Sequence, residues 1–261
     1  MFNLEGRVAV VTGASAGLGR GEAIALARQG ADIAILARRK EKLEEVAEEI
    51  RALGRKCLPV VCDVTVKEQL EHAVEQIIGE YGKVDILVNN TGGGPSAPLE
   101  DMDDETFRFH YDLEILSYFR LTRMLGRYML EQGYGRVINI ASILGMNGLG
   151  MPGEAKTIAY TAFKGAVLSF TKGAAVEWAR RGVTVNSITP GFFESQAVSG
   201  DRLKFLLPMI ERKTPMGRPG RGCKDPELGG ELDSAIIFLA AEESSYVTGA
   251  NICVDGGWSC Y

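Results

Sequence analysis

Short segments rich in valine and isoleucine alternate along this chain of 261 residues with longer segments of helical period. Parallel strands cannot be joined by tight turns and need a long crossover, which is usually a helix. The alternation therefore predicts a single α/β domain, residues 1–261, with a doubly wound seven-stranded parallel sheet. The predicted strands are Arg7–Val11, Asp32–Leu36, Lys56–Cys62, Val84–Val88, Arg136–Ala141, Thr184–Ile188 and Ile252–Val254. The predicted helices are Leu18–Gln29, Lys40–Leu53, Val66–Tyr81, Asp104–Glu131, Thr157–Arg180 and Leu232–Ala240.

The alternation stops between Phe192 and Gly230, where glycine, proline and charged residues surround one apolar stretch, Leu203–Ile210. Long irregular segments in a compact domain are usually functional or disordered. We interpret this segment, about 192–230, as a lid over a substrate.

The composition argues against several classes of protein. A net charge of −5, with Lys and Arg dispersed among Asp and Glu, gives no basic surface for nucleic acid or an anionic membrane. No apolar run approaches the ~20 residues of a membrane span and the N-terminus does not resemble a signal peptide, so we expect a cytoplasmic protein. The five cysteines lack metal-binding spacing and the two histidines, His72 and His110, are isolated, so we expect no metal.

A glycine-rich turn joins the first predicted strand to the first predicted helix. Gly13, Gly17 and Gly19 allow the backbone to approach a pyrophosphate, and the following helix directs its N-terminus at that anion. The alternative is a tight turn that only needs positive φ angles. The turn by itself is a weak indication of a dinucleotide site.

Tyr160 and Lys164 are four residues apart on a predicted helix and therefore project from the same face. A nearby ammonium favours the phenolate, which makes a phenol usable as an acid or base near neutral pH. Ser142 ends the fifth strand, at the sheet edge where open α/β folds bind ligands. Each of these residues taken singly has an equally simple structural explanation. Ser142 would be a cap at the strand end, and Tyr160 and Lys164 would be ordinary helix residues.

Seven signals in this order and spacing closely resemble the short-chain dehydrogenase/reductase family, of the single-domain type with a Rossmann fold. They are Thr12 with Gly13, Gly17 and Gly19; Asp63-Val64; Asn89-Asn90-Thr91-Gly92; Ser142; Tyr160 with Lys164; Pro190-Gly191; and Val254-Asp255-Gly256-Gly257. The resemblance extends from about Leu4 to Trp258. It implies an NAD(P)-dependent oxidoreductase that acts on a small carbonyl or alcohol substrate.

The resemblance also implies a role for each catalytic residue. Tyr160 exchanges a proton with the substrate oxygen, Ser142 hydrogen-bonds that oxygen, and Lys164 lowers the pKa of the phenol while it holds the nicotinamide ribose. Hydride moves between the substrate carbon and nicotinamide C4. The expected cofactor-binding residues are Gly13, Ser15, Gly17, Leu18, Gly19, Arg38, Arg39, Asp63, Val64, Asn90, Thr91, Gly92, Tyr160, Lys164, Pro190, Gly191, Phe193 and Ser195.

The end of the second strand favours NADP(H) over NAD(H). An acidic residue there would bind the ribose hydroxyls and repel a 2′-phosphate, but this chain has Ala37 followed by Arg38 and Arg39. NAD(H) stays possible, because the arginines also fit a solvated helix start. Position 16, where NADP-using relatives often have a basic residue, is Ala16.

Glu114 occupies the place where relatives usually have an asparagine that holds a water beside the lysine. We expect a catalytic role, in which Glu114 holds such a water or pairs with Lys164, and keep a misaligned surface acid as the alternative.

A rival interpretation of the whole chain is a catalytically weak or silent redox-sensing homologue. Relatives reduce 3-oxoacyl thioesters, sugar acids and steroids, so the substrate stays open, and they are commonly homotetramers, which we expect here.

Overall fold

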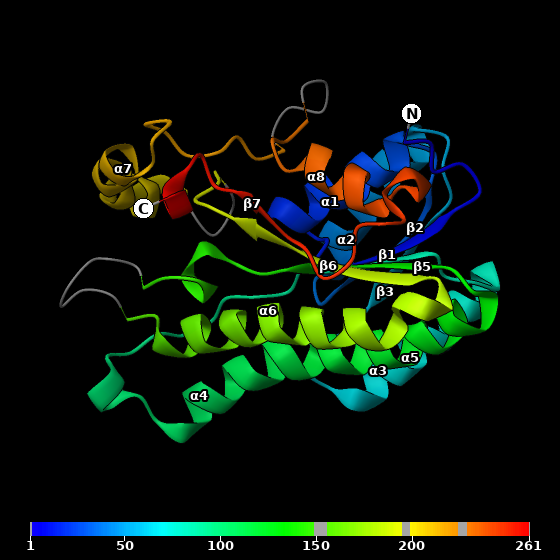
Figure 1. Ribbon diagram of the computed structural model, residues 1–261, viewed down its shortest axis with the longest axis horizontal. Coiled ribbons are helices and arrows are strands. Elements are labelled where there is room, and N and C mark those ends of the chain that lie inside the picture. The colour runs from blue at the N-terminus through cyan, green and yellow to red at the C-terminus, as the bar shows by residue number, and fades with distance from the viewer. Residues whose placement is uncertain (1, 149–155, 195–198, 224–228, 261) are drawn as a thin grey trace.

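A seven-stranded, fully parallel sheet forms the centre of the molecule, with the strand order β3-β2-β1-β4-β5-β6-β7 (Figure 1). The computed structural model describes residues 2–148, 156–194, 199–223 and 229–260. The strands are β1 Val8–Thr12, β2 Asp32–Ala37, β3 Cys57–Val61, β4 Ile86–Asn89, β5 Gly135–Ile140, β6 Val183–Pro190 and β7 Asn251–Val254. The predicted single-domain Rossmann fold is thereby confirmed.

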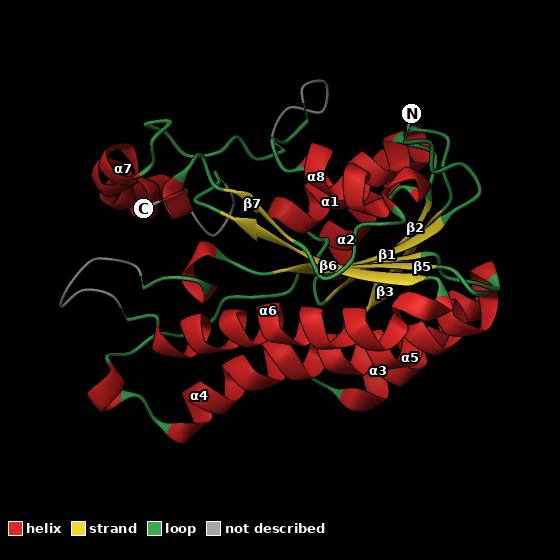
Figure 2. Cartoon of the chain, viewed as in Figure 1, coloured by secondary structure: helices red, strands yellow, loops and turns green. Residues whose placement is uncertain are grey.

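Helices cover both faces of the sheet in two layers (Figure 2). One layer contains α1 (Gly17–Arg28), α2 (Lys40–Ala52) and α8 (Asp233–Ala240). The other contains α3 (Lys67–Tyr81), α4 (Asp104–Tyr111), α5 (Ser117–Gln132) and α6 (Ile158–Trp178). In the described parts of the chain, every helix is too short or too polar to traverse a bilayer.

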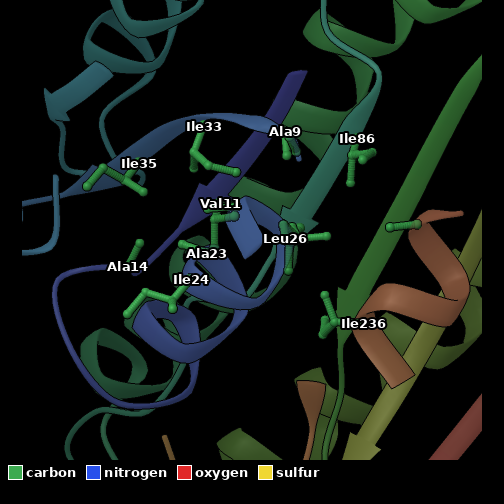
Figure 3. Close-up of a cluster of buried hydrophobic side chains, with 14 of the residues drawn as sticks. Ala9, Val11, Ala14, Ala23, Ile24, Leu26, Ile33, Ile35, Ile86 and Ile236 are labelled. Carbon is green, nitrogen blue, oxygen red and sulfur yellow. The ribbon is translucent and has the colours of Figure 1, made fainter. Parts of the chain in front are cut away.

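The strands are apolar on both faces because each face is covered. All five residues of β1 are buried. Ala9 and Val11 face the layer that contains Ala23, Leu26 and Ile236 (Figure 3), whereas Val10 packs in the opposite cluster. Continuous apolar runs are typical of parallel strands inside such a sandwich. This is why short Val/Ile runs, and not alternating patterns, identified the strands.

The predicted strand bounds agree with the structure to within two residues, but the predicted helix Asp104–Glu131 is not one regular helix. Residues Asp112–Leu116 form a π-helical turn between α4 and α5. The Leu113 carbonyl accepts hydrogen bonds from the hydroxyls of Ser117 and Thr91. Such bulges are frequent at functional sites, and residue periodicity does not reveal them.

A helix that we did not predict, α7 (Gly200–Lys213), lies inside the expected lid segment. Leu206, Met209 and Ile210 are its buried residues and follow helical spacing. They pack with Ile143, Leu144 and Trp258. Pro208 inside the helix lacks the N–H for a regular bond, and this helix-breaking residue hid the pattern.

Glu22 is a buried acid on the sheet-facing side of α1. It is 1% exposed, and neither carboxylate oxygen has a hydrogen-bond partner among the described residues. Burial raises the pKa of Glu22 to about 8, and Asp233 acts in the same direction. The unfolded carboxyl ionises near pH 4.5, so the chain loses stability between about pH 4.5 and pH 8 as only the unfolded form releases this proton.

We predict that Glu22→Gln stabilises the protein progressively more as the pH rises from 5 to 8, because glutamine cannot ionise. The size of the pKa shift corresponds to a difference on the order of 4 kcal/mol over that range. Thermal unfolding of both proteins at several pH values measures it. Glu131→Gln, which changes an exposed carboxyl, is the control. A difference in Tm that does not change with pH would contradict the prediction.

Candidate active site

A cavity of about 670 Å³ opens at the carboxyl ends of the strands. That is the size of a small-molecule or cofactor site, at the place where this class of sheet binds ligands. The predicted site residues that line it are Gly13, Ser15, Gly17, Leu18, Arg38, Arg39, Asp63, Val64, Asn90, Thr91, Gly92, Ser142, Tyr160, Lys164, Pro190, Gly191 and Phe193. Gly19 and Glu114 lie behind its wall, and Ser195 falls outside the described residues.

The glycine turn lies against the end of β4. The Asn90 backbone N–H donates to the hydroxyl of Thr12, and the Asn90 amide donates to the Thr12 carbonyl. A Cβ on Gly19 would be 2.4 Å from that amide nitrogen and 2.7 Å from the Gly13 oxygen, so no side chain fits. Gly13 and Gly17 have φ angles of +67° and +61°, which glycine adopts without strain.

Two arginines at the end of β2, Arg38 and Arg39, line the cavity. The Arg39 guanidinium donates to the hydroxyl of Ser15 over 3.0 Å. Arg38 is largely exposed and lies 3.9 Å from Asp63, whose other carboxylate oxygen accepts two hydrogen bonds from Thr65. The side chain of Ala37 adds no negative charge to this corner. The arrangement is one in which an anion can be held by several donors.

Ser142 follows β5 and begins a short 3₁₀ turn, Ile143–Gly145. Its Oγ accepts a hydrogen bond from the backbone N–H of Leu144 over 3.1 Å. The hydroxyl proton is therefore available for donation into the cavity.

Lys164 is a buried lysine, 2% exposed, one turn after Tyr160 on α6. Its Nζ donates to the carbonyl oxygen of Ile140 over 2.8 Å and to the hydroxyl of Tyr118 over 3.3 Å, and lies 3.5 Å from the Thr91 carbonyl oxygen. The same Nζ lies 5.7 Å from the centroid of the Tyr160 ring. The ammonium is thus fixed beside the phenol by acceptors from two strand ends and α5.

Burial controls the protonation of both side chains. It raises the pKa of Tyr160 to about 12, with Glu114 acting in the same direction and the Ser142 side chain in the opposite one. Burial lowers the pKa of Lys164, whereas Glu114 and Glu22 raise it. The expected lowering of the Tyr160 pKa by Lys164 is therefore not found, because burial raises this pKa instead. The phenol is protonated at neutral pH, which is the form that donates a proton to a carbonyl oxygen.

Glu114 is neither a surface acid nor hydrogen-bonded to Lys164. It is fully buried in the π-helical turn, and its Oε1 lies 2.8 Å from Nδ1 of His110 and accepts a hydrogen bond from the backbone N–H of Gly93. The surface-acid alternative is therefore wrong, and so is the expectation that His110 is isolated. The spacing of His110 and Glu114, four residues apart on a predicted helix, was the signal that could have indicated the pair.

Sequence reasoning also missed several residues of the cavity wall, which come from α4, the segment just before it and the turn after it. They are Met102, Phe109, His110 and Leu113. Across residues 2–148, 156–194, 199–223 and 229–260, no three His, Cys, Asp or Glu side chains lie together to hold a metal ion.

Comparisons with known proteins agree with this geometry. A family model described as short chain dehydrogenase matches residues 7–204. The chain is 36% identical to 3-oxoacyl-(acyl-carrier-protein) reductase FabG of Thermotoga maritima, over 98% of this chain and 99% of that protein. It is 36% identical to 2-dehydro-3-deoxy-D-gluconate 5-dehydrogenase of Dickeya dadantii, over 98% and 97%.

A crystal structure from Beutenbergia cavernae also resembles the fold closely. That protein is named as an NAD(P)-dependent gluconate 5-dehydrogenase and contains bound NADP at low occupancy. The TM-score is 0.89 at 35% identity, covering 100% of this chain and 99% of that one.

Proposed function

The chain belongs to the short-chain dehydrogenase family, and we propose that it transfers hydride between NADP(H) and a small carbonyl or secondary alcohol, with Tyr160 as the proton donor and acceptor. The observation that carries the proposal is that Ser142, Tyr160 and Lys164 line the same cavity as the glycine turn. A silent dinucleotide-binding protein would need only the glycine turn. The silent homologue is therefore not favoured.

The residues present fit a dinucleotide. The close approach at Gly19 and the positive φ angles of Gly13 and Gly17 leave backbone, not side chains, facing the place of a pyrophosphate. We assign Asp63 and Val64 to the adenine, Asn90, Thr91 and Gly92 to the adenosine side, and Lys164 with Tyr160 to the nicotinamide ribose. Pro190, Gly191 and Phe193 border the nicotinamide end, and Ser195 stays a prediction.

We favour NADP(H) as the cofactor. Arg38, Arg39 and Ser15 line the cavity together, where they would hold a 2′-phosphate, and Ala37 presents no carboxylate to repel it. The related structure with bound NADP is consistent with this choice. NAD(H) is the alternative.

The proposed mechanism uses the hydroxyls of Tyr160 and Ser142. When bound, the nicotinamide supplies or accepts the hydride at C4. In reduction, Tyr160 donates its proton to the substrate oxygen as negative charge develops there, and the Ser142 hydroxyl stabilises that charge with a hydrogen bond. Lys164 places its positive charge next to the phenolate that remains.

The cavity wall favours a ketone substrate that carries an anionic group. Lys156 and Arg202 line the cavity, and neither has a hydrogen-bond or ion-pair partner among the described residues. Arg202 lies on α7, so a bound carboxylate would also hold this helix, which is part of the proposed lid, over the substrate. Two related proteins are named for gluconate-type substrates, and a sugar acid fits this chemistry. A 3-oxoacyl thioester is the alternative.

Homotetrameric assembly and cytoplasmic location stay predictions. Phe107 and Tyr111 on α4, Phe119 on α5 and Val176 on α6 are exposed apolar side chains, which is consistent with an interface on this layer.

We predict that Tyr160→Phe lowers turnover by at least about 10³-fold while the Kd of NADPH stays within a few-fold. Loss of absorbance at the nicotinamide band, with NADPH and a panel of ketones, measures turnover, and fluorescence titration measures binding. Tyr128→Phe, an exposed tyrosine on α5, is the control. Retained hydride transfer by Tyr160→Phe would remove the role of Tyr160, and an inactive wild-type protein would favour the silent homologue.

We predict that the double substitution Arg38→Ala and Arg39→Ala weakens NADPH binding by roughly tenfold or more and NADH binding by much less, because only NADPH has the 2′-phosphate. Ala37→Asp in the wild-type background should lower the affinity for NADPH relative to that for NADH, because the new carboxylate repels the 2′-phosphate. Competitive titration of both cofactors measures the ratio, with Arg51→Ala at the other end of α2 as the control. Equal losses for both cofactors would contradict the assignment.

We predict that Arg202→Gln raises the KM of a ketone that carries a carboxylate by roughly tenfold and leaves kcat within a few-fold, since one charge-assisted hydrogen bond is lost. A neutral ketone of similar size should show no change. Lys204→Gln, on the same helix but paired with Asp201, is the control. An equal effect of Arg202→Gln on both ketones would show that the guanidinium does not recognise the anion.

A further inference from the structure

His110 and Glu114 form a buried pair in the wall of the active-site cavity. His110 is 3% exposed and Glu114 is fully buried. The His110 ring lines the cavity and lies 6.4 Å from the Tyr160 ring, nearly perpendicular to it. The proposed reaction assigns no task to either residue, although both lie beside its proton donor.

The hydrogen bonds of the pair fix how many protons it holds. Nε2 of His110 lies 2.9 Å from the Pro95 carbonyl oxygen, which can only accept, so Nε2 carries a proton. Nδ1 lies 2.8 Å from Oε1 of Glu114, and one further proton is shared in that contact. With the shared proton on Nδ1, the pair consists of an imidazolium and a carboxylate and has no net charge. The other oxygen of Glu114, Oε2, has no hydrogen-bond partner among the described residues.

Both ring nitrogens are occupied by these contacts. His110 is thus not free to bind a substrate group or a metal ion through either nitrogen. A side chain at Gly94 would be 3.2 Å from the His110 ring and 2.5 Å from that of Phe109, so the backbone packs closely against this side. These contacts fix the position of the pair, so we argue its effect on the reaction from its charge.

The ionisable groups that face the pair come from two helices. They are Tyr160 and Lys164 of α6 and Tyr118 of α5, and the segment from Thr91 to Pro95 on the other side has none. The hydrogen bond to Glu114 raises the pKa of His110, whereas burial and Lys164 lower it. Burial is the main cause of the raised pKa of Tyr160 and Tyr118 and of the lowered pKa of Lys164, and the Glu114 carboxylate acts in the raising direction on all three.

We propose that His110 is a positioning residue for the proposed reaction: its positive charge neutralises Glu114, so that Tyr160 can release and regain its proton without an unbalanced carboxylate beside it. The inference rests on the proposed function. Loss of the His110 proton leaves a net negative charge in a site of low dielectric. The phenolate form of Tyr160 is then disfavoured, and alcohol oxidation, in which Tyr160 must accept a proton, slows most.

The kinetic test measures how alcohol oxidation depends on pH in three variants: His110→Gln, His110→Gln with Glu114→Gln, and the control His72→Gln. In His110→Gln, which can still donate a hydrogen bond to Glu114, the apparent pKa for alcohol oxidation should rise by about one unit, and kcat/KM near neutral pH should fall roughly tenfold. Adding Glu114→Gln removes the carboxylate and should return the profile to that of wild type or lower. The Kd of NADP should change by no more than a few-fold in any of them.

His72→Gln is the matched control, because His72 is the other histidine of the chain and is exposed. It should leave the pH profile unchanged. If His110→Gln lowers activity equally at every pH, or if the double variant keeps the profile of the single one, the pair has only a structural role and the proposal is wrong.

An NMR measurement on the wild-type protein tests the charge of His110 without any turnover. Protein labelled with ¹⁵N-histidine gives two sets of ring signals, which His72→Gln assigns. We expect both ring nitrogens of His110 to be protonated at pH 7, because the hydrogen bond to Glu114 raises the pKa of this ring. A neutral His110 at pH 7 would overturn the proposal even if the enzyme is active, and a protonated one would leave it standing even if the substrate class is wrong.

Discussion

The hydrogen bonds between Asn90 and Thr12 fix the strand ends from which the whole site is built. They hold β1 and β4 together at the point where the chain passes to opposite faces of the sheet, and sheets of this kind have their ligand crevice at such a switch. Gly19 approaches the Asn90 amide so closely that no side chain fits between them, and this contact fixes the position of the glycine turn. The next strand along, β5, brings Ser142 and the Ile140 carbonyl to this edge. The glycine turn, Ser142 and the carbonyl that accepts from Lys164 therefore lie at one edge of the sheet.

A second hydrogen-bond network joins α5 and α6 to β4 and β5. Asn89 donates to Thr122 and to Asn139, and Asn139 donates to Thr171 of α6. These side chains are buried, and each uses its polar atoms on another member of the network. The position of α6 along the sheet is thereby fixed, and with it the positions of Tyr160 and Lys164. Burial of the same region supplies the electrostatics, because ionisable groups there feel one another across a medium of low dielectric.

The parts that follow local rules were predictable from the sequence. Valine-rich runs located the seven strands, and the spacing of Tyr160, Lys164 and the glycines located the cavity. The sequence did not reveal features that depend on contacts between distant segments or on irregular backbone. Pro208 concealed α7, and the π-helical turn concealed the inward position of Glu114. The contact of His110 with the Pro95 carbonyl oxygen and that of Glu114 with the Gly93 N–H form only where a distant segment folds against this helix. The periodicity of apolar residues indicates which face of a helix packs on the core. It does not indicate which hydrogen-bond partners the His110 ring has in the folded chain.

The central claim is that the hydroxyls of Ser142 and Tyr160 act together on the substrate oxygen. The most direct measurement is a crystal structure of the protein with NADP⁺ and an alcohol that it oxidises slowly. The account predicts the alcohol oxygen about 3 Å from both hydroxyls, with its carbon facing C4 of the nicotinamide. An alcohol oxygen bound to other side chains, with no space for it between Tyr160 and the nicotinamide, would contradict the account.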